Sequence, residues 1–248
     1  MLFKKKKKDY SKESVFRFCC RTDKLFLNFY EFLINSEKIV ESVIGENEYF
    51  DDFKKNIKNE IKNGLIISFK GGETLHLSIN KHKNADLFCS SFYFFYQEKE
   101  LIDSFEKFVL ESSNLYYAVL TNYYDVKWQN EESIANYKVN NKSTKGLSYT
   151  EDLWGEKCID ISKNSGRSVF EDGISYIAGY CSWFSSDFKI NLAQKSNADF
   201  AFSVTELKNN LLRVQLFEEF LPKNFSLIRD KQRLLLNQLL DFEEKNIE

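Results

Sequence analysis

The residue types that could do chemistry are few in this sequence, and they do not occur at catalytic spacing. Only two histidines are present, and neither belongs to an HExxH pattern or accompanies a paired CxxC. His82 lies between Lys81 and Lys83, whose ammonium groups would oppose a bound cation. His76 falls at an outward position of a predicted strand. We therefore expect no metal ion and no cofactor.

Nucleophilic catalysis lacks a recognisable pattern as well. No GxSxG elbow occurs, and the one conceivable Cys–His pair is Cys89 with His76 on neighbouring strands. A buried strand cysteine is usually an inert packing residue, and adjacent Cys19 and Cys20 would point to opposite faces of a strand. The sequence predicts free, mostly buried thiols without a disulfide framework. The five cysteines are Cys19, Cys20, Cys89, Cys158 and Cys181.

Phosphate and acid–base sites are not indicated either. Neither GxxxxGK[ST] nor GxGxxG is present. The paired carboxylates Glu151-Asp152, Glu171-Asp172 and Glu218-Glu219 are adjacent residues, which point apart in a strand or are solvated in a turn. These patterns favour a protein that is not an enzyme. An enzyme with a dispersed, motif-free active site is kept as an alternative.

Composition and charge limit the kinds of partner that this chain is expected to bind. The chain has 248 residues, with 35 basic and 37 acidic side chains and a net charge of -2, which argues against a nucleic-acid footprint. The most apolar window, Leu87 to Tyr96, is about half of the ~20 residues needed to cross a bilayer. The lysine run Lys4 to Lys8 is followed by polar residues and not by the apolar core of a secretory signal. We expect a cytoplasmic protein without a membrane or nucleic-acid partner.

Hydrophobic periodicity predicts alternating helices and strands in residues 1–121. Thr22-Asp23 supplies an N-cap for the first helix, and Gly71-Gly72 between two alternating runs is typical of a hairpin. The predicted strands are Val15–Cys20, Leu65–Phe69, Thr74–Ile79, Leu87–Tyr96 and Leu115–Thr121. The predicted helices begin at Thr22-Asp23, cover Phe50–Ile61 and cover Glu98–Ser112.

Residues 122–145 are polar and rich in asparagine, and we expect a loop or linker there. The remaining residues, 146–248, read as a second α+β half, with strands and a final helix over Ser226–Glu243. Asp187–Ala193 and Asn197–Leu207 are predicted to be helical. The expected fold class is α+β, with largely antiparallel sheet(s) and helices packed on one face. The two halves, 1–121 and 146–248, form one domain or two.

Aromatic residues in polar segments are the remaining functional signal. Tyr and Trp bury a large area at low entropy cost, and they often dominate protein interfaces. The alternative is that the tryptophans cover the core. The predicted partner-binding residues are Tyr123, Tyr124, Asp125, Trp128, Trp154 and Trp183.

The C-terminal half resembles a known family over residues 123–220. An aromatic strand around Tyr123 to Trp128 precedes Gly146 to Leu153, a glycine-turned strand from Asp172 to Ala178, and a segment that ends in Phe188. This order resembles immunity proteins of bacterial polymorphic-toxin and type VI secretion systems. The resemblance implies a cytoplasmic, non-enzymatic protein that binds and blocks one cognate protein toxin. It supplies no catalytic residues.

Two further hypotheses stay open beside this one. They are the motif-free enzyme and a structural or interaction protein of a mobile genetic element. Homo-oligomer formation is also left open.

Overall fold

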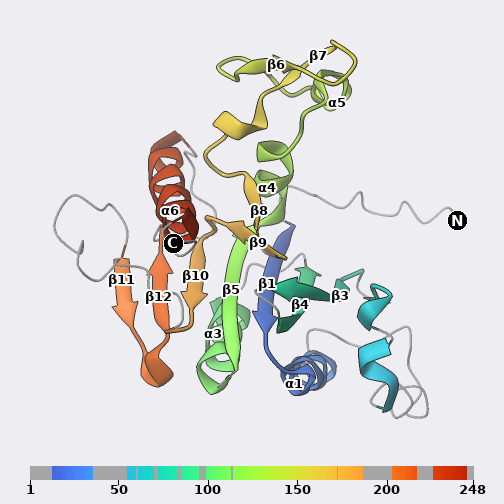
Figure 1. Ribbon diagram of the computed structural model, residues 1–248, viewed down its shortest axis with the longest axis vertical. Helices are drawn as coiled ribbons and strands as arrows, with labels where there is room; N and C mark the ends of the chain where they lie inside the picture. The colour runs from blue at the N-terminus through green and yellow to red at the C-terminus, as the bar shows by residue number, and fades with distance from the viewer. Residues whose placement is uncertain are drawn as a thin grey trace, which may run out of the picture.

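The computed structural model describes residues 13–35, 55–59, 61–69, 72–82, 85–94, 99–112, 114–171, 173–186, 203–216 and 226–244. Eight of its strands form one antiparallel sheet. They are β1 (Ser14–Cys20), β2 (Ile66–Ser68), β3 (Thr74–His82), β4 (Ala85–Phe94), β5 (Leu115–Asn122), β10 (Cys181–Phe184), β11 (Ser203–Glu206) and β12 (Leu212–Gln215). Their spatial order is β11-β12-β10-β5-β1-β4-β3-β2 (Figure 1). Strands from both predicted halves therefore share one continuous sheet, joined where β5 pairs with β10.

Helices and two small hairpins complete the described elements, and the expected α+β class is confirmed. The helices are α1 (Asp23–Ile34), α3 (Lys99–Glu111), α4 (Tyr123–Gln129), α5 (Ile134–Val139), α6 (Ser226–Glu244) and the 3-10 turns Ile161–Lys163 and Lys208–Asn210; residues 55–59 and 61–62 are also helical. The hairpins pair β6 (Tyr149–Glu151) with β7 (Lys157–Ile159) and β8 (Ser168–Glu171) with β9 (Ile174–Ile177).

One face of the sheet packs against α1 and α3 through an aromatic core. Strand alternation sends Phe16 and Phe18 of β1 to this face, where they meet Phe29 of α1 and Phe105 of α3. Helix α1 begins where predicted, because the Thr22 side chain accepts a hydrogen bond from the backbone N–H of Lys24. Cys20 belongs to this core.

The opposite face packs against α6 and the β8–β9 hairpin. Leu235 and Leu239 of α6 join Tyr117 and Val119 of β5 in a second core, and Cys19 belongs to this one. Adjacent Cys19 and Cys20 therefore lie on opposite faces, as predicted. Helices cover both faces of the sheet, however, and not one face as expected, because the apolar stripe of α6 requires its own sheet surface.

The β8–β9 hairpin lies close against β3. The Asn80 side chain donates a hydrogen bond to the Gly173 carbonyl at 2.8 Å. A Cβ on Gly173 would lie 2.2 Å from the Lys81 carbonyl oxygen, and the residue has a φ of 84°. Only glycine combines this backbone conformation with so close an approach.

Residues 123–167, which we call the insertion, connect β5 to β8 and project beyond one end of the sheet (Figure 1). The expected loop or linker over 122–145 is wrong, because α4 and α5 form there. Residues 123–128, expected as a strand in the family resemblance, are helical. Asn122 and Ser133 cap these short helices, and polar helices of this length depend on tertiary contacts that a sequence pattern does not show.

Of the other predicted elements, some are confirmed, one is wrong, and some lie outside the described residues. The hairpin of β2 with β3, the helix α3 and the helix α6 are confirmed. The expected helix over Asn197–Leu207 is wrong where it is described, because Ser203–Glu206 forms β11 against β12. The expected helix over Asp187–Ala193 and the lysine run Lys4 to Lys8 lie outside the described residues.

Replacing Tyr117 with phenylalanine is expected to lower the free energy of unfolding by about 1–2 kcal/mol. The Tyr117 hydroxyl is fully buried, donates to the Ile177 carbonyl at 3.0 Å and accepts from the Ile177 N–H at 3.1 Å. Removing it leaves that N–H in an apolar environment. Urea unfolding at pH 7 measures the change, with Tyr149→Phe, an exposed hydroxyl, as the matched control. Equal stability of the two variants would contradict the assignment.

The effect of Tyr117→Phe on the free energy of unfolding is expected to depend on pH. Burial raises the pKa of the Tyr117 phenol above its ordinary value, despite the hydrogen bond to Ile177. The unfolded chain ionises this group near pH 10 and the folded chain only at higher pH. Its contribution is therefore fully present below about pH 10 and is lost as the pH rises further. Unfolding curves at pH 10.5 and above should show a smaller stability difference between wild type and Tyr117→Phe than curves at pH 7.

Candidate partner-binding surface

The insertion has a small apolar centre of its own. Trp128 of α4 and Tyr137 of α5 meet at 4.9 Å between ring centroids, and Ile159 of β7 packs against them. The Tyr137 hydroxyl donates a hydrogen bond to the Trp128 carbonyl at 2.7 Å. Trp128 is buried in this cluster, so it supports the insertion from inside and is not an exposed anchor.

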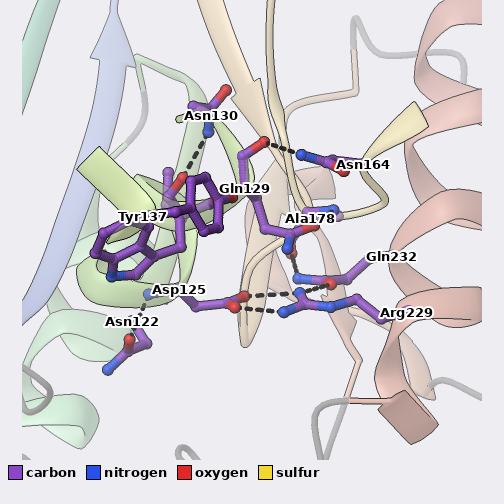
Figure 2. A network of polar contacts seen from close by, with 12 residues as sticks. Asn122, Asp125, Gln129, Asn130, Tyr137, Asn164, Ala178, Arg229 and Gln232 are labelled. Carbon is purple, nitrogen blue, oxygen red and sulfur yellow. Dashed lines mark hydrogen bonds and ion pairs between the residues drawn. The ribbon is translucent and has the colours of Figure 1, made fainter. Parts of the chain in front are cut away.

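An ion pair fastens the insertion to α6 (Figure 2). The Arg229 guanidinium donates to both carboxylate oxygens of Asp125, at 2.9 Å to Oδ2. The same guanidinium donates to Gln232 Oε1 at 2.6 Å, and Gln232 Nε2 donates to the Ala178 carbonyl at 3.0 Å. The carboxylate of Asp125, a predicted binding residue, is therefore engaged in an ion pair inside the protein.

A second set of hydrogen bonds joins the two ends of the insertion to each other. The Asn164 amide donates to the Gln129 carbonyl at 2.9 Å, and the Gly166 N–H donates to Gln129 Oε1 at 3.0 Å (Figure 2). A Cβ on Gly166 would lie 2.9 Å from Arg229 Nη1, so a larger residue here would displace side chains of this network. The Ser168 N–H donates to Asn130 Oδ1 at 2.8 Å. The two ends of the insertion are thus joined to each other, and Asn130 joins them to β8.

Sequence reasoning did not find Arg229 and Gln232. The available signal was the position of Gln232 in the apolar stripe of α6, between Ile228 and Leu235. Gln232 is 2% exposed, and a buried amide in an apolar stripe needs hydrogen-bond partners from another element. The pattern indicates that a partner exists but not which residue it is.

The β6–β7 hairpin carries two exposed apolar side chains. Leu153 is 97% exposed and Trp154 is 84% exposed, and we call residues 152–155 the hairpin tip. Asp152 Oδ1 accepts hydrogen bonds from the N–H of Trp154 at 2.9 Å and of Glu156 at 2.8 Å. The tip is therefore a backbone turn of defined shape that presents Leu153 and Trp154 outward.

The hairpin around this tip is acidic. Residues 149–160 contain the acidic residues Glu151, Asp152, Glu156 and Asp160 and the single basic residue Lys157, which gives a net charge of -3. The Lys157 ammonium lies 4.1 Å from the Tyr149 ring centroid. Partial burial and nearby carboxylates raise the pKa of the Cys158 thiol, so this cysteine stays protonated and is a poor nucleophile.

The other predicted binding residues lie in different surroundings. Tyr123 is half-buried, with its ring 5.0 Å from that of Tyr93. Tyr124 is half-buried beneath the Lys142 ammonium, which lies 4.4 Å from its ring centroid. Trp183 is 1% exposed and packs edge-on against Phe16 in the sheet core, so it cannot contact a partner. The structure does not bring the six residues into one surface, and Trp154 is the one that stands free.

Enzymatic features are weak in the part of the chain that the structure describes. A groove of about 330 Å³ lies between α1 and α3, with lining residues such as Leu25, Phe32, Lys107 and Glu111 but no histidine or cysteine. The Cys89 sulfur lies 3.0 Å from the Cys19 sulfur, across the β1–β4 ladder, and the His76 ring lies 4.9 Å from the Tyr93 ring in a tilted contact. No group of three or more His, Cys, Asp or Glu residues in the described ranges could hold a metal ion.

Comparison with protein-family models, with curated proteins and with solved structures finds no match to this chain. None of the helices in the described ranges is both long enough and apolar enough to span a membrane.

Proposed function

We propose that this chain is a cytoplasmic immunity-type protein that binds one cognate bacterial toxin and blocks it through the hairpin tip. The observation that carries the proposal is the exposure of Leu153 and Trp154 on a turn whose backbone is held by Asp152. Large apolar side chains that project from a fixed turn are typical of a protein contact, because their burial stabilises a complex at low entropy cost.

The surroundings of the tip support a protein partner with a basic rim. Residues 149–160 carry a net charge of -3, whereas the whole chain carries only -2, so negative charge is concentrated around the hairpin tip. Charge of one sign around an apolar anchor accelerates association with an oppositely charged partner and disfavours other partners. A toxin whose functional surface is basic would fit this hairpin.

The attachment of the insertion supports the same proposal. The ion pair of Asp125 with Arg229 holds the insertion to α6, and the hydrogen bonds of Gln129 hold the two ends of the insertion to each other. A binding element that is already ordered loses little conformational freedom on association. The toxin class itself comes from the family resemblance of residues 123–220, and the hairpin tip supplies the contact that such a protein requires.

Replacing Trp154 with alanine is expected to weaken toxin binding at least 30-fold, which corresponds to about 2 kcal/mol. The stability of the free protein should change by less than about 0.5 kcal/mol, because Trp154 is exposed. Calorimetry with the toxin encoded beside the gene measures binding, and co-expression measures protection. Phe170→Ala, which removes another exposed aromatic side chain, is the matched control and should bind as wild type does. Full protection by Trp154→Ala, or absence of binding to that toxin, would contradict the proposal.

A further inference from the structure

A polar row crosses three neighbouring strands on the sheet face that carries α6. The register places Arg17 of β1 beside Ser91 of β4, and Ser91 beside His76 of β3. Their strand neighbours Phe16, Phe18, Leu75 and Leu77 are buried on the opposite face. Alternation therefore directs Arg17, Ser91 and His76 to one side of the sheet.

Among the residues that the structure describes, the Arg17 guanidinium is held by neutral hydroxyl groups. Nε donates to Ser91 Oγ at 2.9 Å, and Nη1 donates to Ser175 Oγ of the β8–β9 hairpin at 2.7 Å. Within the described ranges, Nη2 makes no hydrogen bond and no carboxylate forms an ion pair with Arg17. Arg17 is half-buried, and a guanidinium removed from water normally has an anionic partner, because the loss of hydration is otherwise uncompensated.

A row of aromatic side chains lies beside Ser91 on the same side of the sheet. The His76 ring lies 4.9 Å from Tyr93, and Tyr93 lies 5.0 Å from Tyr123 in an edge-to-face contact. Partial burial and the positive charge of Arg17 lower the pKa of His76, so its imidazole is neutral at pH 7 and has one N–H to donate. The surroundings of Arg17 thus contain hydroxyl and imidazole donors.

We propose that Arg17 and its neighbours Ser91, Ser175 and His76 form a binding site for a small oxyanion, either a carboxylate or a phosphate group. A guanidinium presents planar, paired donors that match both groups. The serine hydroxyls orient the guanidinium, and the anion completes the charge pairing that the described residues leave open. This site is separate from the hairpin tip and does not depend on the proposed toxin-binding function.

A histidine NMR titration tests the site directly, because the chain has two histidines and His82→Gln assigns the signal of His76. Sodium phosphate and sodium acetate are added separately at constant ionic strength. We expect a saturable shift of the His76 signal with a dissociation constant of about 1 mM. Tighter binding of phosphate would identify a phosphate site, and tighter binding of acetate a carboxylate site; either result supports the proposal.

Variants separate the Arg17 site from general salt effects. Arg17→Gln should abolish the saturable shift, whereas Arg21→Gln, at an exposed arginine just after β1, should leave it unchanged. Ser175→Ala should weaken binding several-fold without altering the sheet, and it serves if Arg17→Gln does not fold. The proposal is overturned if neither anion gives a saturable shift in the wild type, or if Arg17→Gln or Ser175→Ala, when folded, binds as tightly as the wild type.

Discussion

Replacing Phe16 with alanine is expected to lower the free energy of unfolding by about 3–5 kcal/mol, the cost of removing a fully buried aromatic ring. Phe16 is 0% exposed at the centre of the first core. Its ring stacks on Phe105 of α3 at 4.6 Å and contacts Phe29 of α1 at 5.5 Å. It therefore joins both helices to the middle of the sheet, and the cavity left by alanine cannot be filled by one neighbour moving.

Chemical denaturation monitored by circular dichroism measures this loss. Phe170→Ala removes the same side chain from a position that is 71% exposed, and its stability should stay within about 0.5 kcal/mol of wild type. A loss below about 1 kcal/mol for Phe16→Ala would show that β1 is not at the centre of the core.

Replacing Asp125 with alanine is expected to lower the free energy of unfolding by about 3 kcal/mol, since it removes the carboxylate that pairs with the largely buried guanidinium of Arg229. The Asp125 and Arg229 side chains are 10% and 23% exposed, and the carboxylate binds the guanidinium through both oxygens. Its removal leaves Arg229 with Gln232 as a neutral partner. Without this ion pair, α4 should also lose its attachment to α6.

The paired variant Asp125→Leu with Arg229→Met should recover much of this loss, because it removes both charges from the buried site together. Asp230→Ala is the control, since Asp230 is 83% exposed and pairs with Arg233 on the surface of α6. Thermal and urea unfolding of the variants measure the differences. If Asp125→Ala costs no more than Asp230→Ala, the network of Figure 2 does not stabilise the attachment of the insertion.

Local patterns were sufficient for elements whose residues carry their own periodicity. The alternation of Leu212, Val214 and Leu216 predicts a strand, and Leu212–Gln215 forms β12. The Thr22 cap and the apolar stripe of Leu25, Phe29 and Leu33 predict α1. In both cases the apolar residues recur with the period of the strand or the helix, so the buried face can be identified from the sequence.

Local sequence patterns did not predict contacts between residues that lie far apart in the sequence. Ser203–Glu206 is polar and largely exposed, and it forms a strand because β12 offers an edge beside it. The short helices α4 and α5 form where composition indicates a loop, because Trp128 of α4 packs on Tyr137 of α5 and Arg229 of α6 pairs with Asp125 of α4. Contacts between residues far apart in sequence leave no local period.

The candidate partner-binding surface was likewise only partly predictable from the sequence. The sequence shows Trp154 in polar surroundings, and residue types alone mark it as a contact candidate, whereas the turn that holds it is seen in the structure. Trp154 and Trp183 are equal in chemistry, yet one is 84% exposed and the other 1% exposed. Which aromatic ring is covered depends on which strands and helices pack over it, and that is set by tertiary contacts that no stretch of neighbouring residues encodes.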